Sequence, residues 1–491
     1  MATSSTKSKV LHGIFWKLME RGGTQALQFI IQIILARLLL PADYGVIALI
    51  AIFIAIASVF VHSGFNTALI QKKNADKLDF SSVFYLSLFV SILMYGFLYL
   101  SAPAIARFYD ESQIIPVLRV LSITLFFGAV NSVQYAVVSR EMKFKKVFFS
   151  SLGGMLFSGI LGIGMAFMGF GVWALVAQHL VQQILITFIL WFTVKWRPSS
   201  EFSLARLRNL FAFGGKLLCS SLLETVYHNI YGLVIGKFYN AEMLGYFTRG
   251  DQFPKLLMTN INSSISSVML PALSAHQEDK NRVKAMVRRS IVTSSFVIFP
   301  LMAGLAVCAE PLVNLLLTEK WLPCVPFLQI MCLAYAFWPV HTANLQAINA
   351  LGRSDIFLKL EIIKKCIGVA ALLISVPFGI YVMVAFKPVT SVISTAINSY
   401  PNRKLLDYSF KEQWIDIMPS LLLSVVMGAA IYTVNYSGWN ELTKLFVQVI
   451  AGIVIYTGLA YLLKLECFIY LLDTVKQLLH KNAERKWNCN E

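Results

Sequence analysis

Four basic residues lie inside long apolar stretches of this 491-residue sequence. Arg21 falls in the stretch 12–40, Lys216 in 209–236, Lys255 in 241–270 and Lys387 in 379–400. An ionisable group in the middle of a bilayer costs about 2.5–3.5 kcal/mol on insertion scales, so it usually faces a cavity or a partner. Arg and Lys bind phosphate oxygens, Arg through a planar fork of donors and Lys as a compact charge. The chemistry indicated is the binding of an anion within a membrane.

Three of these cations also have a simpler explanation. Lys216 is close enough to the end of its stretch to reach lipid headgroups by snorkelling. Arg21 follows Glu20 directly and could pair with it or with a neighbouring helix. Lys255 follows Asp251 by four residues, which on a helix brings the two charges together without any ligand.

Lys387 has no acidic residue in its own stretch, and a polar cavity is the favoured environment for it. The predicted substrate-binding residues are Arg21, Lys255, Lys387, Lys216 and Arg249. The acidic residues Glu20, Glu224 and Asp251 are either structural ion-pair partners or binding groups for a coupling cation.

Other chemistry finds little support in the sequence. There is no phosphate-binding loop of the Walker type, no HExxH, no GxSxG and no paired-carboxylate motif, so no catalytic residue is predicted. Single histidines in apolar stretches are expected to be hydrogen-bonded packing residues more often than ligands or proton carriers: His62, His179, His228 and His341. The seven cysteines have no metal or redox spacing. No metal and no cofactor is expected.

The positions of these residues depend on the apolar stretches, which dominate the composition. The chain is 57% apolar and only 14% charged, with a mean hydropathy of +0.68. A soluble protein carries about 25% charged residues, so most of this surface must face lipid. Stretches long enough to span a bilayer as helices occupy 12–40, 43–70, 80–105, 114–138, 147–169, 171–194, 209–236, 241–270, 286–309, 323–349, 356–377, 379–400, 414–436 and 440–463. The sequence predicts an all-α integral membrane protein with fourteen transmembrane helices.

The distribution of Lys and Arg predicts the orientation. The formal net charge is +17, which in a soluble protein would suggest nucleic acid as a partner. Here most of the 42 cations fall in alternate connections, including 71–79, 139–146, 195–208 and 271–285. The opposite face holds few, in its connections and in the adjoining parts of the spans: Arg37, Arg107, Arg119, Lys237, Arg249, Lys320 and Lys444. By the positive-inside rule both termini are predicted to be cytoplasmic, and no nucleic acid partner is expected.

An internal repeat divides the chain. RLLLPADYG at 37–45 recurs as KFYNAEMLG at 237–245, and Ile115-Pro116-Val117-Leu118 resembles Val325-Pro326-Phe327-Leu328. Six helices in each copy give two pseudo-symmetric lobes of the same orientation, related by an axis along the membrane normal. The predicted regions are an N-lobe at 1–195, a C-lobe at 196–412, two extra helices at 413–464 and a cytoplasmic amphipathic tail at 465–491.

The opening WKLMERGGTQALQFIIQIILARLLLPADYGVIAL and the later AEMLGYFTRGDQFPKL resemble a known family. With two lobes of six helices plus two, the whole chain is similar to the Wzx-type, colanic-acid-exporter-like polysaccharide flippases of the multidrug/oligosaccharidyl-lipid/polysaccharide (MOP) exporter superfamily. The resemblance implies an inner-membrane protein, not an enzyme, that carries undecaprenyl-pyrophosphate-linked oligosaccharide between leaflets by alternating access. It also implies that Arg21 and Lys255 contact the pyrophosphate.

Two other functions stay open. A cation-coupled multidrug or small-molecule exporter of the same superfamily would normally lack the two extra helices and have an acidic cavity. A membrane glycan polymerase or ligase would usually have a large outer loop, and the outer connections here are short. Expected partners are the lipid-linked oligosaccharide, membrane lipids and the polysaccharide polymerase machinery. The protein is expected to be monomeric.

Overall fold

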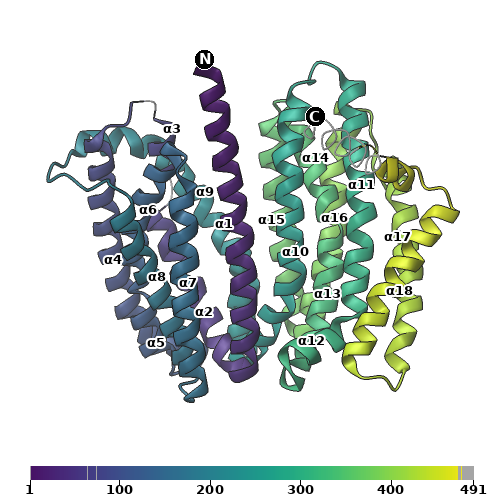
Figure 1. Cartoon of the computed structure of the whole chain (residues 1–491), viewed down its shortest axis with the longest axis horizontal. Helices are drawn as coiled ribbons and strands as arrows, with labels where there is room; N and C mark the ends of the chain where they lie inside the picture. Colours follow the sequence, from purple (N-terminus) through teal and green to yellow (C-terminus); the bar gives the residue numbers. More distant parts are fainter. Residues whose placement is uncertain (1, 63–64, 73, 474–476, 478–491) are drawn as a thin grey trace, which may run out of the picture. The chain divides into compact units, whose positions relative to one another are not determined.

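The computed structural model describes residues 2–62, 65–72, 74–473 and 477, and among them it contains helices, turns and no β-strand. The chain forms two compact units, Met1–Thr248 and Arg249–Glu491. In each unit the long helices run side by side, as the ribbon shows (Figure 1). The predicted all-α class is confirmed for the part of the chain that the structure describes.

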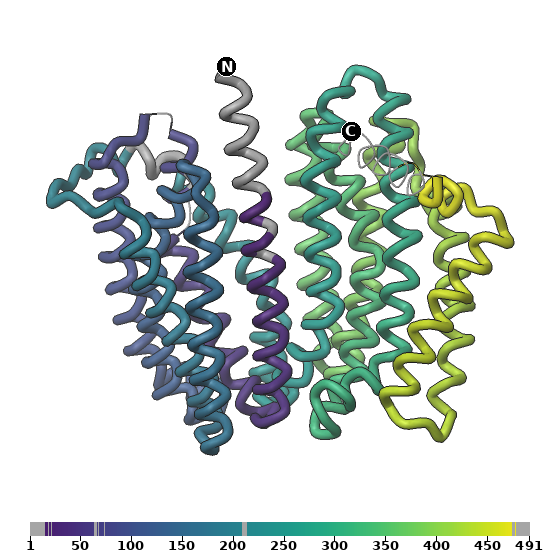
Figure 2. The backbone as a smooth tube through the Cα atoms, viewed as in Figure 1, coloured from purple at the N-terminus to yellow at the C-terminus, as the bar shows by residue number. Residues whose placement is uncertain are grey.

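Within its described residues, the first unit contains nine helices and the beginning of a tenth. They are α1 (Ala2–Leu38), α2 (Pro41–His62), α3 (Phe65–Gln71), α4 (Lys77–Tyr109), α5 (Ile114–Leu121), α6 (Thr124–Glu141), α7 (Phe144–Phe167), α8 (Val172–Thr193), α9 (Leu204–Phe238) and the first turns of α10 (Ala241–Ser274). The backbone trace follows this order from purple to teal (Figure 2).

The second unit contains the rest of α10 and the helices that follow it. They are α11 (Lys280–Val307), α12 (Ala309–Leu317), η1 (Glu319–Cys324), α13 (Val325–Ala336), α14 (Trp338–Ala350), α15 (Ser354–Ser375), η2 (Val376–Phe378), α16 (Ile380–Leu405), α17 (Phe410–Tyr432), η3 (Thr433–Tyr436) and α18 (Glu441–Leu462).

Ten of the described helices, or helix pairs that follow one another directly, are long and apolar enough to cross a membrane. Many of their large apolar side chains point outward, for example Leu100 with 79% of its surface exposed, as expected where lipid is the solvent. The other four predicted spans coincide with α1, α9, α10 and α15, which are long but more polar. The total of fourteen spans therefore stays a prediction.

The predicted cytoplasmic connections of the first unit meet at one end of it. Asp79, which is fully buried at the start of α4, accepts from the Lys72 ammonium at 2.6 Å. Arg206 of α9 lies 3.6 Å from the same carboxylate. Arg140 at the end of α6 donates to the carbonyl oxygens of Leu69 and Lys72, where α3 ends. A cation at a helix C-terminus satisfies carbonyls that have no partner within the helix.

The beginnings of α2 and α10 cross at positions that are 200 residues apart in the repeat. A Cβ atom added to Gly45 would lie 1.6 Å from the carbonyl oxygen of Ala241. A Cβ atom added to Gly245 would lie 2.1 Å from the carbonyl oxygen of Pro41. Gly45 thus contacts Ala241, which is the repeat equivalent of Pro41. Gly245, the repeat equivalent of Gly45, contacts Pro41 itself. Such reciprocal contact is what a twofold relation between two equal turns requires, so it supports the repeat in these segments.

In the second unit, α17 packs along α11, and α18 completes a hairpin with α17. Arg288 of α11 donates to both carboxylate oxygens of Asp416 of α17 at 2.7 and 2.8 Å. The first residues of the predicted tail contact the same part, because Phe468 lies 6.0 Å from the ring of Phe296. Most of the predicted amphipathic tail, 474–491 except Gln477, lies outside the described residues.

Candidate functional site

Asp251 and Lys255 occupy one face of α10 in the second unit, one turn apart. The Lys255 ammonium lies 3.6 Å from Asp251 Oδ2, so the local ion pair that the sequence allowed is formed. The Asp251 side chain is 14% exposed, whereas the Lys255 side chain is 58% exposed. The ammonium group is therefore still available to a ligand.

The other oxygen of the carboxylate is held by an aromatic side chain. Tyr335 at the end of α13 donates its hydroxyl to Asp251 Oδ1 at 2.8 Å. The Tyr335 ring stacks on Trp338 of α14, with centroids 5.1 Å apart and planes inclined by 19°. The two aromatic rings thus fix the carboxylate in place from the neighbouring helices.

Lys387 of α16 belongs to the same group of charges. Its ammonium interacts electrostatically with both Asp251 and Lys255. Two cations therefore share one carboxylate, and the group of Asp251, Lys255 and Lys387 carries a net positive charge. Each lysine also adjoins a proline within its helix, Pro254 or Pro388, where a backbone hydrogen bond is missing and the helix is free to bend.

The remaining predicted site residues lie elsewhere. Arg249 is buried, donates to Gln252 Oε1 at 2.5 Å and lies over the ring of Trp321 at 5.7 Å. Lys216 is exposed on α9. Arg21 is part of α1, but its side chain is outside the part that the structure describes.

Two of the predicted acidic residues form local pairs in the first unit. Glu20 accepts from the Lys17 ammonium at 2.7 Å, and Glu224 lies 3.5 Å from His228 Nε2 on an exposed face of α9. Both pairs involve residues three or four apart on one helix, which is the structural alternative that the sequence left open. Among the described residues, no group of three His, Cys, Asp or Glu side chains is placed to hold a metal ion.

Two features of this unit were not predicted from the sequence: Tyr335 and a row of polar residues that continues from Lys387 along α16. The row is Ser391, Thr395, Asn398, Ser399 and Asn402, and each of them has another member three or four residues away. That spacing on one face of an otherwise apolar helix was visible in the sequence. The role of Tyr335 was not visible, because its partner is 84 residues away.

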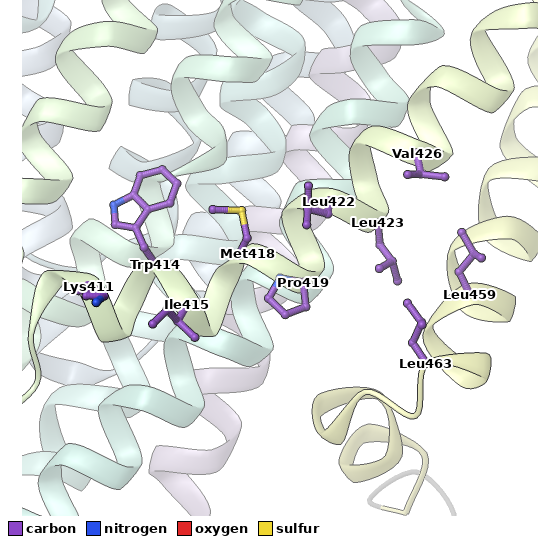
Figure 3. A pocket seen from close by; sticks show the side chains of 10 residues that line it. All are labelled: Lys411, Trp414, Ile415, Met418, Pro419, Leu422, Leu423, Val426, Leu459 and Leu463. Carbon is purple, nitrogen blue, oxygen red and sulfur yellow. The ribbon is translucent and has the colours of Figure 1, made fainter.

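A separate groove lies between α17 and α18 (Figure 3). Its volume is about 680 Å³, and its lining residues are Lys411, Trp414, Ile415, Met418, Pro419, Leu422, Leu423, Val426, Leu459 and Leu463. Lys411 lies at one end, and almost all of the remaining surface is apolar. Such a lining suits hydrocarbon and offers little to an anionic group.

These features define a class of protein: a multi-pass helical membrane protein whose ionisable groups gather within its bundle, as in transporters. Residues 34–326, more than half of the chain, match the profile of a family described as "Polysaccharide biosynthesis protein". The chain belongs to this family.

Two characterised relatives cover most of the chain. The teichuronic acid biosynthesis protein TuaB of Bacillus subtilis (strain 168) is 26% identical over 415 residues, which is 82% of this chain and 84% of that protein. The lipopolysaccharide biosynthesis protein WzxC of Escherichia coli (strain K12) is 22% identical over 441 residues, or 86% of this chain and 88% of that protein. The predicted resemblance to Wzx-type proteins is confirmed.

Two solved structures have the same fold. The lipid II flippase MurJ in an inward closed conformation superposes with a TM-score of 0.71 at 17% identity, covering 90% of this chain and 97% of that one. A MATE family multidrug resistance transporter of the MOP superfamily, in an inward-facing conformation, gives 0.57 at 15% identity, with 84% and 96% covered. At these identities the likeness concerns the fold, which is the fold predicted from the sequence.

Proposed function

We propose that this protein is a flippase for undecaprenyl-pyrophosphate-linked oligosaccharide in the bacterial inner membrane. It moves the sugar headgroup from the cytoplasmic to the outer leaflet by alternating access and so supplies surface polysaccharide biosynthesis. The observation that carries the proposal is the group of Lys255, Lys387 and Asp251, a net positive charge within the helical bundle of a polysaccharide biosynthesis protein.

The charge of this group fits a pyrophosphate. The headgroup carries at least two negative charges and cannot cross hydrocarbon alone. Two ammonium groups around one carboxylate favour an anion, and in a partly desolvated site each pairwise interaction is several times stronger than in water. Polar residues follow Lys255 along α10, namely Thr259, Asn260, Asn262, Ser263 and Ser264, and offer hydrogen bonds to a sugar.

Arg21, Lys216 and Arg249 complete the proposed set of cations for the headgroup. Asp251 and Glu224 are the proposed acidic residues for a coupling ion, with Glu20 as a structural partner of Lys17. We further propose that both termini are cytoplasmic, that the protein acts as a monomer and that it delivers its product to a polysaccharide polymerase. This function is transport and not enzymatic catalysis, in agreement with the flippases and transporters among the similar proteins.

A multidrug exporter is the second candidate, supported by the common fold with the MATE transporter. Such a protein binds cationic drugs, which a cluster of two lysines and one carboxylate would repel.

The test uses proteoliposomes containing the purified chain and a radiolabelled undecaprenyl-pyrophosphate-linked oligosaccharide. A glycosidase added outside should release label from the inner leaflet at a rate that depends on the protein. A rate equal to that of protein-free liposomes, together with ethidium export, would replace the proposal with the second candidate.

A further inference from the structure

The polar row on α16 forms two hydrogen-bonded groups with its neighbours. The first joins α14, α16 and α17: Asn344 Nδ2 donates to Gln413 Oε1 at 2.9 Å, and Ser399 Oγ donates to the same oxygen at 2.8 Å. Asn402 Nδ2 donates to Asn344 Oδ1 at 2.6 Å. These neutral groups hold one another, and a buried network of this kind fixes three helices in register.

The second group surrounds His341 of α14, and its geometry fixes the tautomer of the ring. Ser391 Oγ and Thr395 Oγ1 lie 3.2 and 3.4 Å from His341 Nε2. Each hydroxyl already donates its hydrogen to a backbone carbonyl, Ser391 to Ala334 at 2.8 Å and Thr395 to Ser391 at 3.0 Å. Both oxygens can therefore only accept from the ring. The hydrogen of the neutral imidazole is on Nε2, and Nδ1 carries the free electron pair.

Asn398, which faces Nδ1, can hydrogen-bond to the ring in either protonation state. Asn398 Nδ2 lies 3.4 Å from His341 Nδ1 and donates to it in the neutral state. Asn398 is fully buried, and its own oxygen, Oδ1, has no hydrogen-bond partner. A half-turn of this amide would exchange nitrogen for oxygen, and the oxygen would then accept from a protonated Nδ1. When the ring is neutral, the buried Asn398 Oδ1 has no donor. When the ring is protonated, the hydrogen on His341 Nδ1 is that donor.

Charged residues around the ring decide when it takes up a proton. From α15, Lys364 acts electrostatically on the ring and is paired with Glu361 at 2.6 Å. On α16, Lys387 precedes Ser391 by one turn, about 6 Å along the axis. Tyr335 is the nearest ionisable residue of α13 along the chain, and α11 carries none beyond Arg289. The charge that acts directly on His341 is thus Lys364, and Lys387 lies one turn from Ser391, which contacts the ring. An anion bound to Lys387 would add a negative charge on this side of the ring and favour its protonation.

We propose that His341 binds a proton at Nδ1 when an anionic headgroup binds to Lys255 and Lys387, which makes the proton part of the transport cycle. The inference rests on the proposed function for its ligand, though not for the proton site itself. The sequence alone favoured a packing role for this histidine. The donor and acceptor pattern around the ring and the unpaired oxygen of Asn398 argue for a proton site. By linkage, protonation must strengthen anion binding by the same factor.

The test uses the full chain in nanodiscs and undecaprenyl pyrophosphate as the probe. Titration calorimetry in two buffers with different ionisation enthalpies gives the number of protons taken up on binding. We expect proton uptake in the wild type. Lowering the pH to 6 should raise the affinity by about tenfold more than the titration of the headgroup alone explains. The uptake should disappear in His341→Gln and in Asn398→Leu. It should persist in His179→Gln, a matched change in the first unit. Uptake that persists in His341→Gln would overturn the proposal.

A second measurement separates this proposal from the proposed function. In the chain labelled with ¹⁵N-histidine and free of ligand, the Nδ1 signal of His341 should change as the pH is lowered from 9 to 3. The midpoint should move in Lys387→Met, which removes the nearby charge. If the wild type fails to bind undecaprenyl pyrophosphate but the signal still titrates, the proposed function is wrong and the proton site stands. If the signal does not change over this range, the proton site is refuted.

Discussion

At the scale of single residues, the net charge of the site depends on how many cations act on one carboxylate. Asp251 is held by the Tyr335 hydroxyl at 2.8 Å and by Lys255 at 3.6 Å, so its negative charge is already compensated before Lys387 is counted. Lys387 acts on the same carboxylate, so the group of two lysines and one aspartate carries a net positive charge. In a medium of low dielectric constant, such an excess favours an anion over a cation.

We expect Lys387→Ala and Lys255→Ala to reduce lipid transport by about tenfold or more, because each removes a charged partner of the headgroup. Lys216→Ala should weaken transport less, because Lys216 is exposed on α9 and can reach the lipid headgroups of the inner side. Arg21→Ala should abolish transport, and Arg21→Lys should restore it in part, since Lys lacks the planar fork of donors. Complementation scored for surface polysaccharide, with protein amounts measured by blotting, checks this. Full activity of the Arg21→Ala, Lys255→Ala, Lys387→Ala triple variant would rule out the anion mechanism.

Asp79 provides a prediction on stability and not on transport. It is fully buried and compensates both Lys72 and Arg206. Asp79→Ala should cost about 1–2 kcal/mol, because α4 loses its capping box while the two partly exposed cations lose a solvent-screened partner. The melting temperature in detergent should fall by several degrees. Asp110→Asn is the control, because Asp110 is 88% exposed at its side chain. Equal melting temperatures for the two variants would contradict this assignment.

Sequence reasoning at this scale succeeded where partners are close along the chain. Asp251 and Lys255, four apart, were paired from spacing alone. For Glu20 the sequence suggested Arg21 as the partner, and the structure gives Lys17. The contacts of Tyr335 and His341 could not be predicted from spacing, since their partners lie 50 to 84 residues away and depend on how the helices pack. The choice between lining a cavity and packing, which matters most for function, is made by such distant contacts.

At the scale of elements, apolar length predicted where the helices lie but not where they break. The predicted span 114–138 consists of α5 and α6, and the predicted span 323–349 consists of α13 and α14. Pro339 explains the second break, because it has no N–H to donate and stands at the start of α14. At the first break there is no proline, and the Ser122 and Thr124 hydroxyls bond to carbonyls of α5 instead. Both breaks fall in the fourth span of a predicted lobe.

The crossing of α2 and α10 leads to a prediction about helix packing. Gly45→Ala and Gly245→Ala should each destabilise the protein by about 1–3 kcal/mol or more, since a single methyl group would overlap the backbone of the other helix. Gly96→Ala in α4 meets nothing within 4 Å and should be neutral or stabilising by roughly 0.5–1 kcal/mol. Thermal unfolding in detergent compares the three. If Gly45→Ala melts like Gly96→Ala, the two helices do not meet at this glycine pair.

At the scale of the whole molecule, the distribution of cations predicts which side of the membrane each connection faces, and this stays a prediction. Contacts within the first unit show only which segments lie at the same end of it. Segments predicted on the cytoplasmic side bond to one another, as Ser199 does to Ser81 at 2.9 Å. Segments predicted on the outer side do the same, as Arg119 does to the Tyr99 carbonyl oxygen at 3.4 Å. The division into units at Thr248 and Arg249, inside α10, could not be predicted, because contact density depends on packing and not on sequence similarity.

The absolute orientation follows from the cations alone and is open to a direct test. In a variant without native cysteines, Lys143→Cys and Ser112→Cys place single thiols in exposed connections on opposite sides. Lys143 belongs to a connection rich in Lys and Arg, which are retained on the cytoplasmic side during insertion. We therefore expect an impermeant maleimide added to intact cells to label position 112 and not position 143, and to label both after the membrane is opened. Labelling of position 143 from outside would reverse the orientation, and lipid would then be carried from a side on which the cytoplasmic enzymes cannot supply it.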